Sequence, residues 1–435
     1  MQDLAHSLRR QARDFAAKVI YRIAGLPISL RAMFDRDDTA PDAVIRRAYA
    51  QRILHPQRME DALALIVALL LWPAAVAGMV VAFLFVNGTV VARRSQRSLH
   101  RQLFDQLRLY LTAGVLPPAY YMYELYDHPA SSYARNFIYR CESKAGVMTL
   151  LKEGVRKPTT ILNDKVACAE FCQLHQIATI PVLAAFRDGI AQIQTSPEEL
   201  DTDLFVKLIN GKGGKGAERW DCIAGGLYRN PAGRELSRTS LFERLAAVST
   251  DEPRFVQPRI RNHPDLAPFA NGALSTIRVL TCINEQGEPE VIGAAMRMAV
   301  GSNHTVDNLH AGGIAAAVDL VTGRLGPASN LGVNCRLGWI DRHPVSNAQI
   351  AGYRLPGWDD VREFGLRSHK AFNDRVIVGW DIAITGDGPI LVEANGGPDL
   401  DIIQRVARHG MMASRLGILL AFHLSQLGLD NLTVF

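Results

Sequence analysis

The 435-residue chain is poor in the features that mark several protein classes. None of its six cysteines belongs to a Cys-x-x-Cys pair, which argues against a disulfide framework or a structural zinc site and favours reduced thiols in a cytosolic core. Aromatic residues make up only 7% and no run of five or six like charges occurs, so the net charge of +5 does not indicate a nucleic-acid partner. The 48% of hydrophobic residues excludes a disordered chain and predicts a sizeable core.

One long segment lacks charge altogether. No charged side chain occurs from Ala62 to Ala92, a run of 31 residues, whereas about 20 residues suffice to cross a bilayer. The segment lies too far into the chain to be a signal peptide. We therefore predict a membrane segment over residues 61–92, with a buried core helix as the alternative. Both flanks are rich in arginine and Pro73 interrupts the run, so a single span and a re-entrant hairpin both remain open.

The regions on either side of this segment have helical patterns. In residues 1–60, apolar residues recur at helical spacing with arginines between them, which predicts a basic amphipathic helical region broken near residues 25–27. Such a region either lies on an anionic membrane surface or packs against the rest of the protein. Residues 93–160 predict a helical connecting region with a stop at Pro117 and Pro118.

From about residue 161 the chain alternates short β-rich runs with glycine turns and helical stretches. This alternation is typical of an α+β fold with several hairpins. The runs are LFVKLI, RFVQPRI, STIRVLTCI, EVIGAAMRMAV, RVIVGWDIAIT and PILVEAN.

The last two runs flank Gly386-Asp387-Gly388 and predict a β-hairpin. If the turn centres on Asp387, Asp381 and Glu393 stand directly opposite each other, with Cβ atoms about 4.5–5.5 Å apart. Asn395 lies on the same face as Glu393. Two facing carboxylates repel each other, and a divalent cation between oxygen ligands would remove that penalty, which favours Mg²⁺. The alternative is a tolerated acidic pair on a solvated sheet face.

A glycine-rich loop follows the run LFVKLI. Gly211, Gly213 and Gly216 formally satisfy Gly-x-Gly-x-x-Gly, but neither the Rossmann context nor a Walker or protein-kinase motif accompanies them. Glycines let backbone N–H groups approach phosphate closely, and the lysines of this segment supply positive charge. The segment therefore predicts a loop that covers phosphate, with a simple exposed loop as the alternative.

These motifs, together with Asn163-Asp164-Lys165 and Ile180-Pro181, occur in an order that resembles the ATP-grasp superfamily over about 60% of the chain. The most similar variant is the sugar-transfer-associated ATP-grasp family, which is related to glutamate-ligase-like proteins. The resemblance implies two α+β lobes that enclose ATP, a small lobe at 161–256 and a large lobe at 257–435, behind the helical regions and the membrane segment. The α/β domain that precedes the core in many relatives is missing from the pattern, so the resemblance does not identify the substrates. The first metal ligand is Asp where many relatives have Glu.

The resemblance also implies roles for individual residues. Lys165 and Lys207 would contact ATP phosphates. Arg278 and Arg297 would contact the transferred phosphate, and His310 is either a proton acceptor, a substrate contact or a structural residue of its loop. The loop over the phosphates comprises Gly211, Lys212, Gly213, Gly214, Lys215 and Gly216; the adenine strand is Gln257, Pro258, Arg259 and Ile260; and the ligands of one or two Mg²⁺ ions, with Mn²⁺ as the substitute, are Asp381, Glu393 and Asn395.

The activity that the resemblance implies is ATP- and Mg²⁺-dependent ligation of a carboxylate to an amine through an acyl phosphate, with release of ADP and phosphate. We expect small-molecule or sugar-linked substrates from cell-envelope or polysaccharide precursor metabolism. We also expect contact with membrane lipid at the cytoplasmic face of the inner membrane, a catalytic domain in the cytosol, and no nucleic acid. The alternatives are an ATP-grasp phosphotransferase and a non-catalytic nucleotide-binding scaffold.

Overall fold

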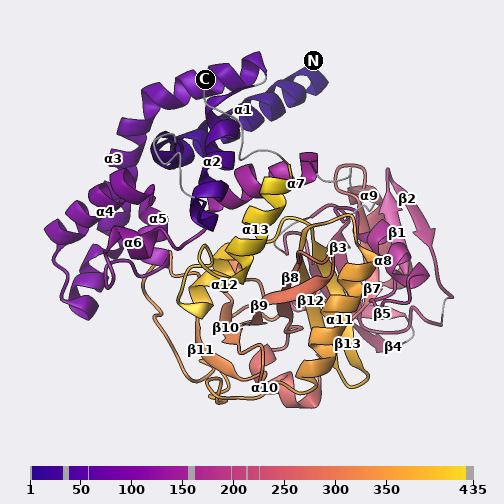
Figure 1. The fold of residues 1–435 in the computed structure, drawn as a ribbon. Helices are drawn as coiled ribbons and strands as arrows, with labels where there is room; N and C mark the ends of the chain where they lie inside the picture. The colour runs from indigo at the N-terminus through magenta and orange to yellow at the C-terminus, as the bar shows by residue number, and fades with distance from the viewer. Residues whose placement is uncertain are drawn as a thin grey trace.

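The computed structural model describes residues 2–32, 39–56, 58–154, 162–196, 198–211, 214–224 and 226–427 (Figure 1). A helical part comes first and is followed by two β-sheets with their own helices, which confirms the predicted α+β class. The helical part comprises α1 (Gln2–Ala32), α2 (Pro41–Leu54), α3 (Met59–Ser95), α4 (Leu99–Ala113), α5 (Pro117–Met122), α6 (Ser131–Ala134), the π-helix η1 (Cys141–Val147) and α7 (Met148–Gly154).

Helix α1 runs through the predicted break without interruption. A proline inside a helix removes one hydrogen bond and costs about 3 kcal/mol. Here Leu26 and Ile28, the neighbours of Pro27, are both buried against other helices, so tertiary packing offsets this cost. The predicted stop at Pro117 and Pro118 is also misplaced. Helix α4 already ends at Gly114, which caps it in the left-handed conformation, and the two prolines begin α5.

The uncharged segment forms the central part of α3, a single helix of 37 residues that continues through Pro73. The segment is therefore not folded into a re-entrant hairpin. By length and composition, α3 is the one helix of the described residues that is suited to cross a membrane, and 22% of its most apolar stretch is buried within the protein. It lies along the outer side of the helical part, away from the sheets (Figure 1).

The first sheet has seven antiparallel strands in the order β2-β1-β7-β3-β4-β5-β6. Its elements are α8 (Lys165–Leu174), β1 (Ala184–Arg187), β2 (Ile190–Ile193), β3 (Leu204–Leu208), β4 (Glu218–Ala224), β5 (Leu227–Arg229), β6 (Glu235–Ser237), α9 (Arg238–Val248) and β7 (Arg254–Pro258). Val206 and its neighbours on one face pack against α9. The opposite face packs against α8 through Phe255 and carries Lys207, which lies opposite Phe255 in the ladder.

The second sheet has six antiparallel strands in the order β11-β10-β9-β8-β12-β13. Its elements are η2 (Pro264–Leu266), α10 (Ala267–Ala270), β8 (Ile277–Ile283), β9 (Pro289–Met298), η3 (Leu309–Ala311), β10 (Ile314–Val318), β11 (Leu325–Ser329), α11 (Trp358–Ala371), β12 (Ile377–Thr385), β13 (Gly388–Asn395), α12 (Leu400–Ala407) and α13 (Arg415–Gln426). Helix α11 covers one face, while α12 and α13 cover the other. All six β-rich runs of the sequence are strands, as predicted.

The helical part is fixed to this second sheet through α2. Val44, Ile45 and Ala48 of α2 share a core with α12 and α13. In Figure 1 the yellow helix α13 lies directly below the helical part and joins it to the sheet. The segment between α6 and η1 is also attached here, since Arg140 lies beside Asp399, which follows β13.

Candidate active site

The β12–β13 hairpin places the predicted acidic pair as expected, although its turn is different. The tip is a two-residue turn, with Thr385 opposite Gly388, which would pair Asp381 with Val392 if the ladder continued unchanged. A β-bulge then adds one residue to β13 and brings Glu393 opposite Asp381. Bulges next to active sites commonly re-aim side chains in this way.

Asp381 is buried and held by two guanidinium groups. Its carboxylate accepts two hydrogen bonds from Arg278, one of 3.0 Å from Nη2 to Oδ2, and lies 3.0 Å from Arg297 Nη2. Burial opposes ionisation of the carboxyl, but the two arginines outweigh it and lower the pKa of Asp381. Arg278 is buried as well, yet Asp381 raises its pKa. The arginines therefore relieve the repulsion within the acidic pair, so that repulsion alone is no argument for a metal ion.

Arg297 is positioned by Thr276 and Asp307. Arg297 donates to Thr276 Oγ1 over 2.6 Å and lies 3.2 Å from Asp307 Oδ1. Asp307 in turn accepts hydrogen bonds from the backbone N–H and the hydroxyl of Thr276. This positioning role could not be predicted from the sequence, because Thr276 and Asp307 are 31 positions apart and no local pattern links them.

Glu393 and Asn395 add two further side chains with oxygen atoms to the face that carries Asp381. The Glu393 side chain is 34% exposed, and its Oε1 lies 3.6 Å from Lys165 Nζ. Asn395 Nδ2 is buried without a hydrogen-bond partner among the described residues, so no contact from that atom fixes the amide. Two carboxylates and a carboxamide on adjacent strands fit Mg²⁺, which prefers oxygen ligands.

Two lysines approach this group from the first sheet. Asp164 caps the N-terminus of α8 by accepting hydrogen bonds from two backbone N–H groups, and this fixes Lys165 at the first helical position. Lys165 Nζ also donates to the Gly211 carbonyl over 2.6 Å. On β3, desolvation lowers the pKa of Lys207, and the charge of Glu393 opposes this shift most strongly.

The glycine loop extends from β3 toward the second sheet. Gly214 has a φ of +73°, and a Cβ atom built there would lie 3.2 Å from Val306, which precedes η3. The loop therefore touches the opposite side of the cleft. Gly216, with a φ of +67°, packs on Leu208 instead. Lys212 and Gly213 lie outside the described residues.

A cleft of about 840 Å³ gathers nearly all of the predicted residues. Among those that line it are Lys165, Lys207, Gly211, Gly214, Lys215, Gln257, Pro258, Arg259, Ile260, Arg278, Arg297, His310, Asp381, Glu393 and Asn395. Gly216 is not among them. Gln257 is held by a hydrogen bond of 2.9 Å from its Nε2 to the Ile180 carbonyl, which joins the predicted adenine strand to the Ile180-Pro181 motif.

The helical part supplies one wall of this cleft, which the sequence analysis did not foresee. Arg140, Lys144 and Lys152 line it, as does Arg375 from the second sheet. Arg140 and Lys144 both lie beside Asp399. Lys144 belongs to η1, and burial lowers its pKa. Sequence patterns gave no signal for these residues because Asp399 lies 259 positions from Arg140.

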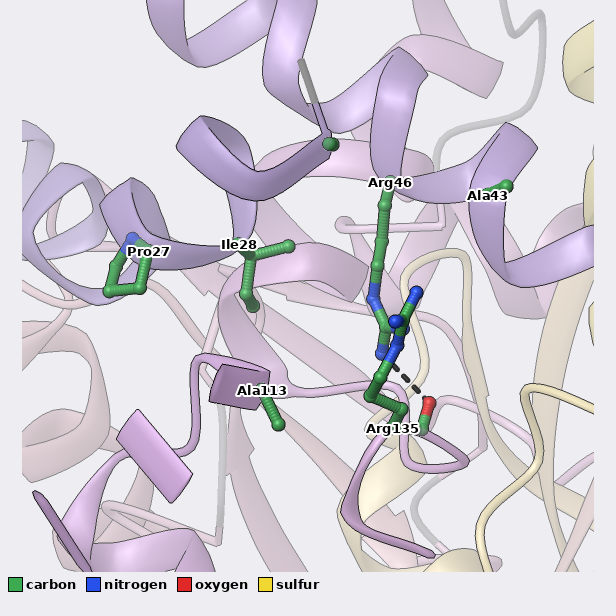
Figure 2. Close-up of a pocket in the computed structure, with 7 residues that line it drawn as sticks. Pro27, Ile28, Ala43, Arg46, Ala113 and Arg135 are labelled. Atoms are coloured by element: carbon green, nitrogen blue, oxygen red, sulfur yellow. Dashed lines mark hydrogen bonds between the residues drawn. The ribbon is translucent and has the colours of Figure 1, made fainter. Parts of the chain in front are cut away.

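A second cavity lies between α1, α2 and α4 and shares no lining residue with the cleft. Figure 2 shows Pro27, Ile28, Ala43 and Ala113 around it, with Arg46 donating a hydrogen bond to the Arg135 carbonyl. Its volume of about 10 Å³ leaves room for a single water molecule at most. The large cleft is therefore the candidate active site.

Several solved structures share similarity with the chain. A D-alanine–D-alanine ligase from Bacillus anthracis complexed with ATP is 12% identical over 62% of this chain and 67% of its own, with a TM-score of 0.35. The VanG D-Ala:D-Ser ligase from Enterococcus faecalis is 13% identical over 62% of each chain, with a TM-score of 0.34. An L-amino acid ligase from Bacillus licheniformis is 11% identical, with a TM-score of 0.34; the match covers 60% of this chain but only 48% of that ligase.

A comparison with curated proteins gives no match. The family model described as sugar-transfer associated ATP-grasp matches residues 152–417. This range contains both sheets and every residue of the acidic pair, the two lysines and the two arginines. The chain therefore belongs to the sugar-transfer associated ATP-grasp family.

Proposed function

We propose that the protein is an ATP-dependent ligase that joins a carboxylate to an amine through an acyl phosphate. One observation carries the proposal: a single cleft brings together two lysines, two buried arginines and the acidic pair from six different elements. Lysines, arginines and carboxylates arranged in this way can bind a nucleoside triphosphate and stabilise the charge that develops during phosphoryl transfer.

Each group has a role that follows from its position. Lys165 and Lys207 hold the phosphates of ATP, and the glycine loop excludes water from the acyl phosphate. The substrate carboxylate attacks the γ-phosphorus and displaces ADP; the amine then attacks the acyl carbon, loses a proton and displaces phosphate. Arg278 and Arg297 stabilise the negative charge in both steps. His310 lines the cleft and is the proposed proton acceptor.

Asp381, Glu393 and Asn395 are the proposed ligands of Mg²⁺. When bound, the ion neutralises charge on the β- and γ-phosphates. Asp381 keeps its arginine partners in this arrangement, since a carboxylate has about four acceptor sites. Glu393 would exchange its 3.6 Å contact with Lys165 for the ion.

The wall formed by Arg140, Lys144 and Lys152 is the proposed binding surface for the carboxylate substrate. These cations lie along the loop that follows Asn395, where a Cβ atom built on Gly397 would lie 3.7 Å from Lys152 Nζ. In this family member the helical part thus takes the place of a substrate-binding domain. An anionic, sugar-linked envelope precursor processed at the cytoplasmic face of the inner membrane agrees with this wall, the family description and helix α3.

The proposal is tested with the full chain in mild detergent, Mg²⁺-ATP and pooled carboxylates and amines, including sugar acids and amino acids. We expect ADP and phosphate in equal amounts, dependent on both an acid and an amine. Glu393→Gln should lower turnover about a hundredfold or more, because it removes the negative charge of a proposed ligand of the ion that neutralises the phosphates. Glu288→Gln is the matched control, since Glu288 pairs with Lys370 on the surface. ADP without phosphate release would instead indicate a phosphotransferase, and AMP with pyrophosphate would contradict an acyl phosphate.

Lys144→Met tests the substrate wall separately, because it keeps the apolar stem and removes the charge. We expect KM for the carboxylate to rise about tenfold, which corresponds to about 1.4 kcal/mol, while the affinity for ATP stays unchanged. The control is Lys370→Met at an exposed lysine of α11. An equal loss of ATP affinity would show that Lys144 serves the nucleotide instead.

A further inference from the structure

The exposed side of α4 carries four leucines and a phenylalanine, whereas its buried side includes three polar side chains. Leu99, Leu103, Leu107 and Leu111 recur every four residues, lie on one face and are all exposed, together with Phe104 at 64%. The residues buried on the opposite side are Gln102, Asp105, Gln106, Leu109, Tyr110 and Ala113. In a helix that faces water the apolar residues point to the core, so this arrangement fits an apolar medium outside α4.

The buried polar groups of α4 have partners within the helical part. Gln102 Nε2 donates to the carbonyls of Gly88 and Arg97 over 2.9 and 2.8 Å, and Tyr121 donates to Gln102 Oε1 over 3.1 Å. Asp105 lies 2.7 Å from Arg97 Nη2. A rotation of α4 that buried the leucines would break these contacts, so the exposed leucine face is fixed by the fold.

Helix α3 continues this surface. Its buried residues are small or short: Ala64, Ala68, Val76, Val80, Asn87, Gly88 and Val91. Its outer side presents large side chains, among them Leu70 at 75% and Phe85 at 87% exposure. The two helices meet where a Cβ atom built on Gly88 would contact Leu99. We call the outer sides of α3 and α4 together the apolar face.

Both ends of α3 are attached to the same folded body. Near its start, Glu60 and Asp61 lie 3.0 and 3.2 Å from Lys18 of α1. Near its end, Asn87 donates to the Val333 carbonyl over 3.1 Å and accepts from the Cys335 N–H over 2.9 Å, which joins α3 to a loop beyond β11. A helix held at both ends on one side of a bilayer cannot cross it without drawing charged groups into the hydrocarbon.

Beyond Glu60 and Asp61 at the start of α3, the charge around the apolar face is nearly all positive. From Ala62 to Val115 the sequence contains five arginines and one acidic residue, Asp105, which is buried and paired with Arg97. Arg93, Arg94 and Arg101 are exposed. An apolar surface with an arginine border complements a bilayer that carries anionic lipids.

We propose that the apolar face lies in one leaflet of an anionic bilayer, with α3 and α4 along the membrane plane and no helix of the described chain crossing it. The proposal rests on the membrane association included in the proposed function and is independent of the ligase chemistry. Insertion to a shallow depth suits helices with one apolar and one protein-packed side. This arrangement places the membrane on the side of the helical part that faces away from the sheets.

Flotation of the full chain with vesicles tests the surface. We expect binding to vesicles of phosphatidylcholine with phosphatidylglycerol, weaker binding to phosphatidylcholine alone, and at least a tenfold loss in Leu103→Glu/Leu107→Glu. The matched control is Leu174→Glu/Val321→Glu, which places two glutamates at exposed apolar positions outside the helical part. Unchanged melting temperatures would show that both variants fold. Equal binding of the two double variants, or no binding of the unchanged protein, would overturn the proposal.

A depth measurement tests the orientation. Nitroxide labels are attached to Leu70→Cys and Phe85→Cys, which lie about 22 Å apart along the axis of α3. The labelling of the unchanged protein is subtracted as background. We expect equal, shallow depths for the two labels. One deep and one interfacial label would establish a crossing helix and contradict the proposal. Because neither measurement uses ATP, a failed ligase assay would leave both results unaffected.

Discussion

Helices α4 and α11 are similar in length and both have one apolar face, but they use it in opposite ways. Helix α11 buries Trp358, Val361 and Phe364 against the second sheet and exposes Asp359 and Glu363. Helix α4 buries Gln102 and Asp105 and exposes leucines. The comparison teaches that the spacing of apolar residues identifies the two faces of a helix. The surroundings of the helix then decide which of the two faces is buried.

Substitution of one phenylalanine in each helix should give the largest difference in stability between α11 and α4. Phe364→Ala should lower the free energy of unfolding by about 3–5 kcal/mol, because it leaves a cavity in the core of the second sheet. Phe104→Ala removes an exposed ring, so its effect should stay within about 0.5 kcal/mol. Urea denaturation in mild detergent measures both variants. Similar losses would mean that Phe104 is buried by the protein itself.

For the polar residues on the buried sides, the loss of stability should be larger in α4 than in α11. Gln102→Ala leaves the Gly88 carbonyl and the Tyr121 hydroxyl without their partner, so we expect a loss of about 2–3 kcal/mol. The Ser368 hydroxyl of α11 is buried with no hydrogen-bond partner among the described residues. Ser368→Ala should therefore be neutral or slightly stabilising. The same denaturation assay decides, and a neutral Gln102→Ala would show that the polar interior of α4 contributes no stability.

A smaller difference in stability between the two helices depends on pH. His369 of α11 is buried, and desolvation lowers its pKa from 6.5 to about 4. As the pH falls below about 6.5, the unfolded chain takes up a proton that the folded protein refuses, so this contribution to stability is lost between pH 6.5 and 4. The loss between pH 7 and pH 5 should be about 2 kcal/mol.

The control for this prediction is His369→Gln, which cannot titrate and should flatten the pH dependence over that window. Gln102 of α4 likewise has no proton to gain. Denaturation curves at several pH values measure the slopes, and an unchanged slope in His369→Gln would assign the pH dependence to another group.

The strands could be predicted from the sequence because alternation over a few residues is a local signal, and all six runs are strands. The pairing of Asp381 with Glu393 was also predicted, although two one-residue deviations, the tip and the bulge, cancel there. The break at residues 25–27 was wrong because burial of Leu26 and Ile28 outweighs the local effect of Pro27. Arg140 and Lys144 could not be predicted, because the docking of η1 beside Asp399 depends on contacts between distant segments.

The bulge in β13 has a consequence for how family members can differ from one another. Because the extra residue, and not the turn, sets Glu393 opposite Asp381, the hairpin tip is free to lengthen or shorten in pairs of residues without disturbing the two acids. A hairpin with the same two-residue tip and no bulge would instead place Val392 opposite Asp381. Homologous chains are better aligned from the Glu-x-Asn end of the strand, where insertions would change the chemistry.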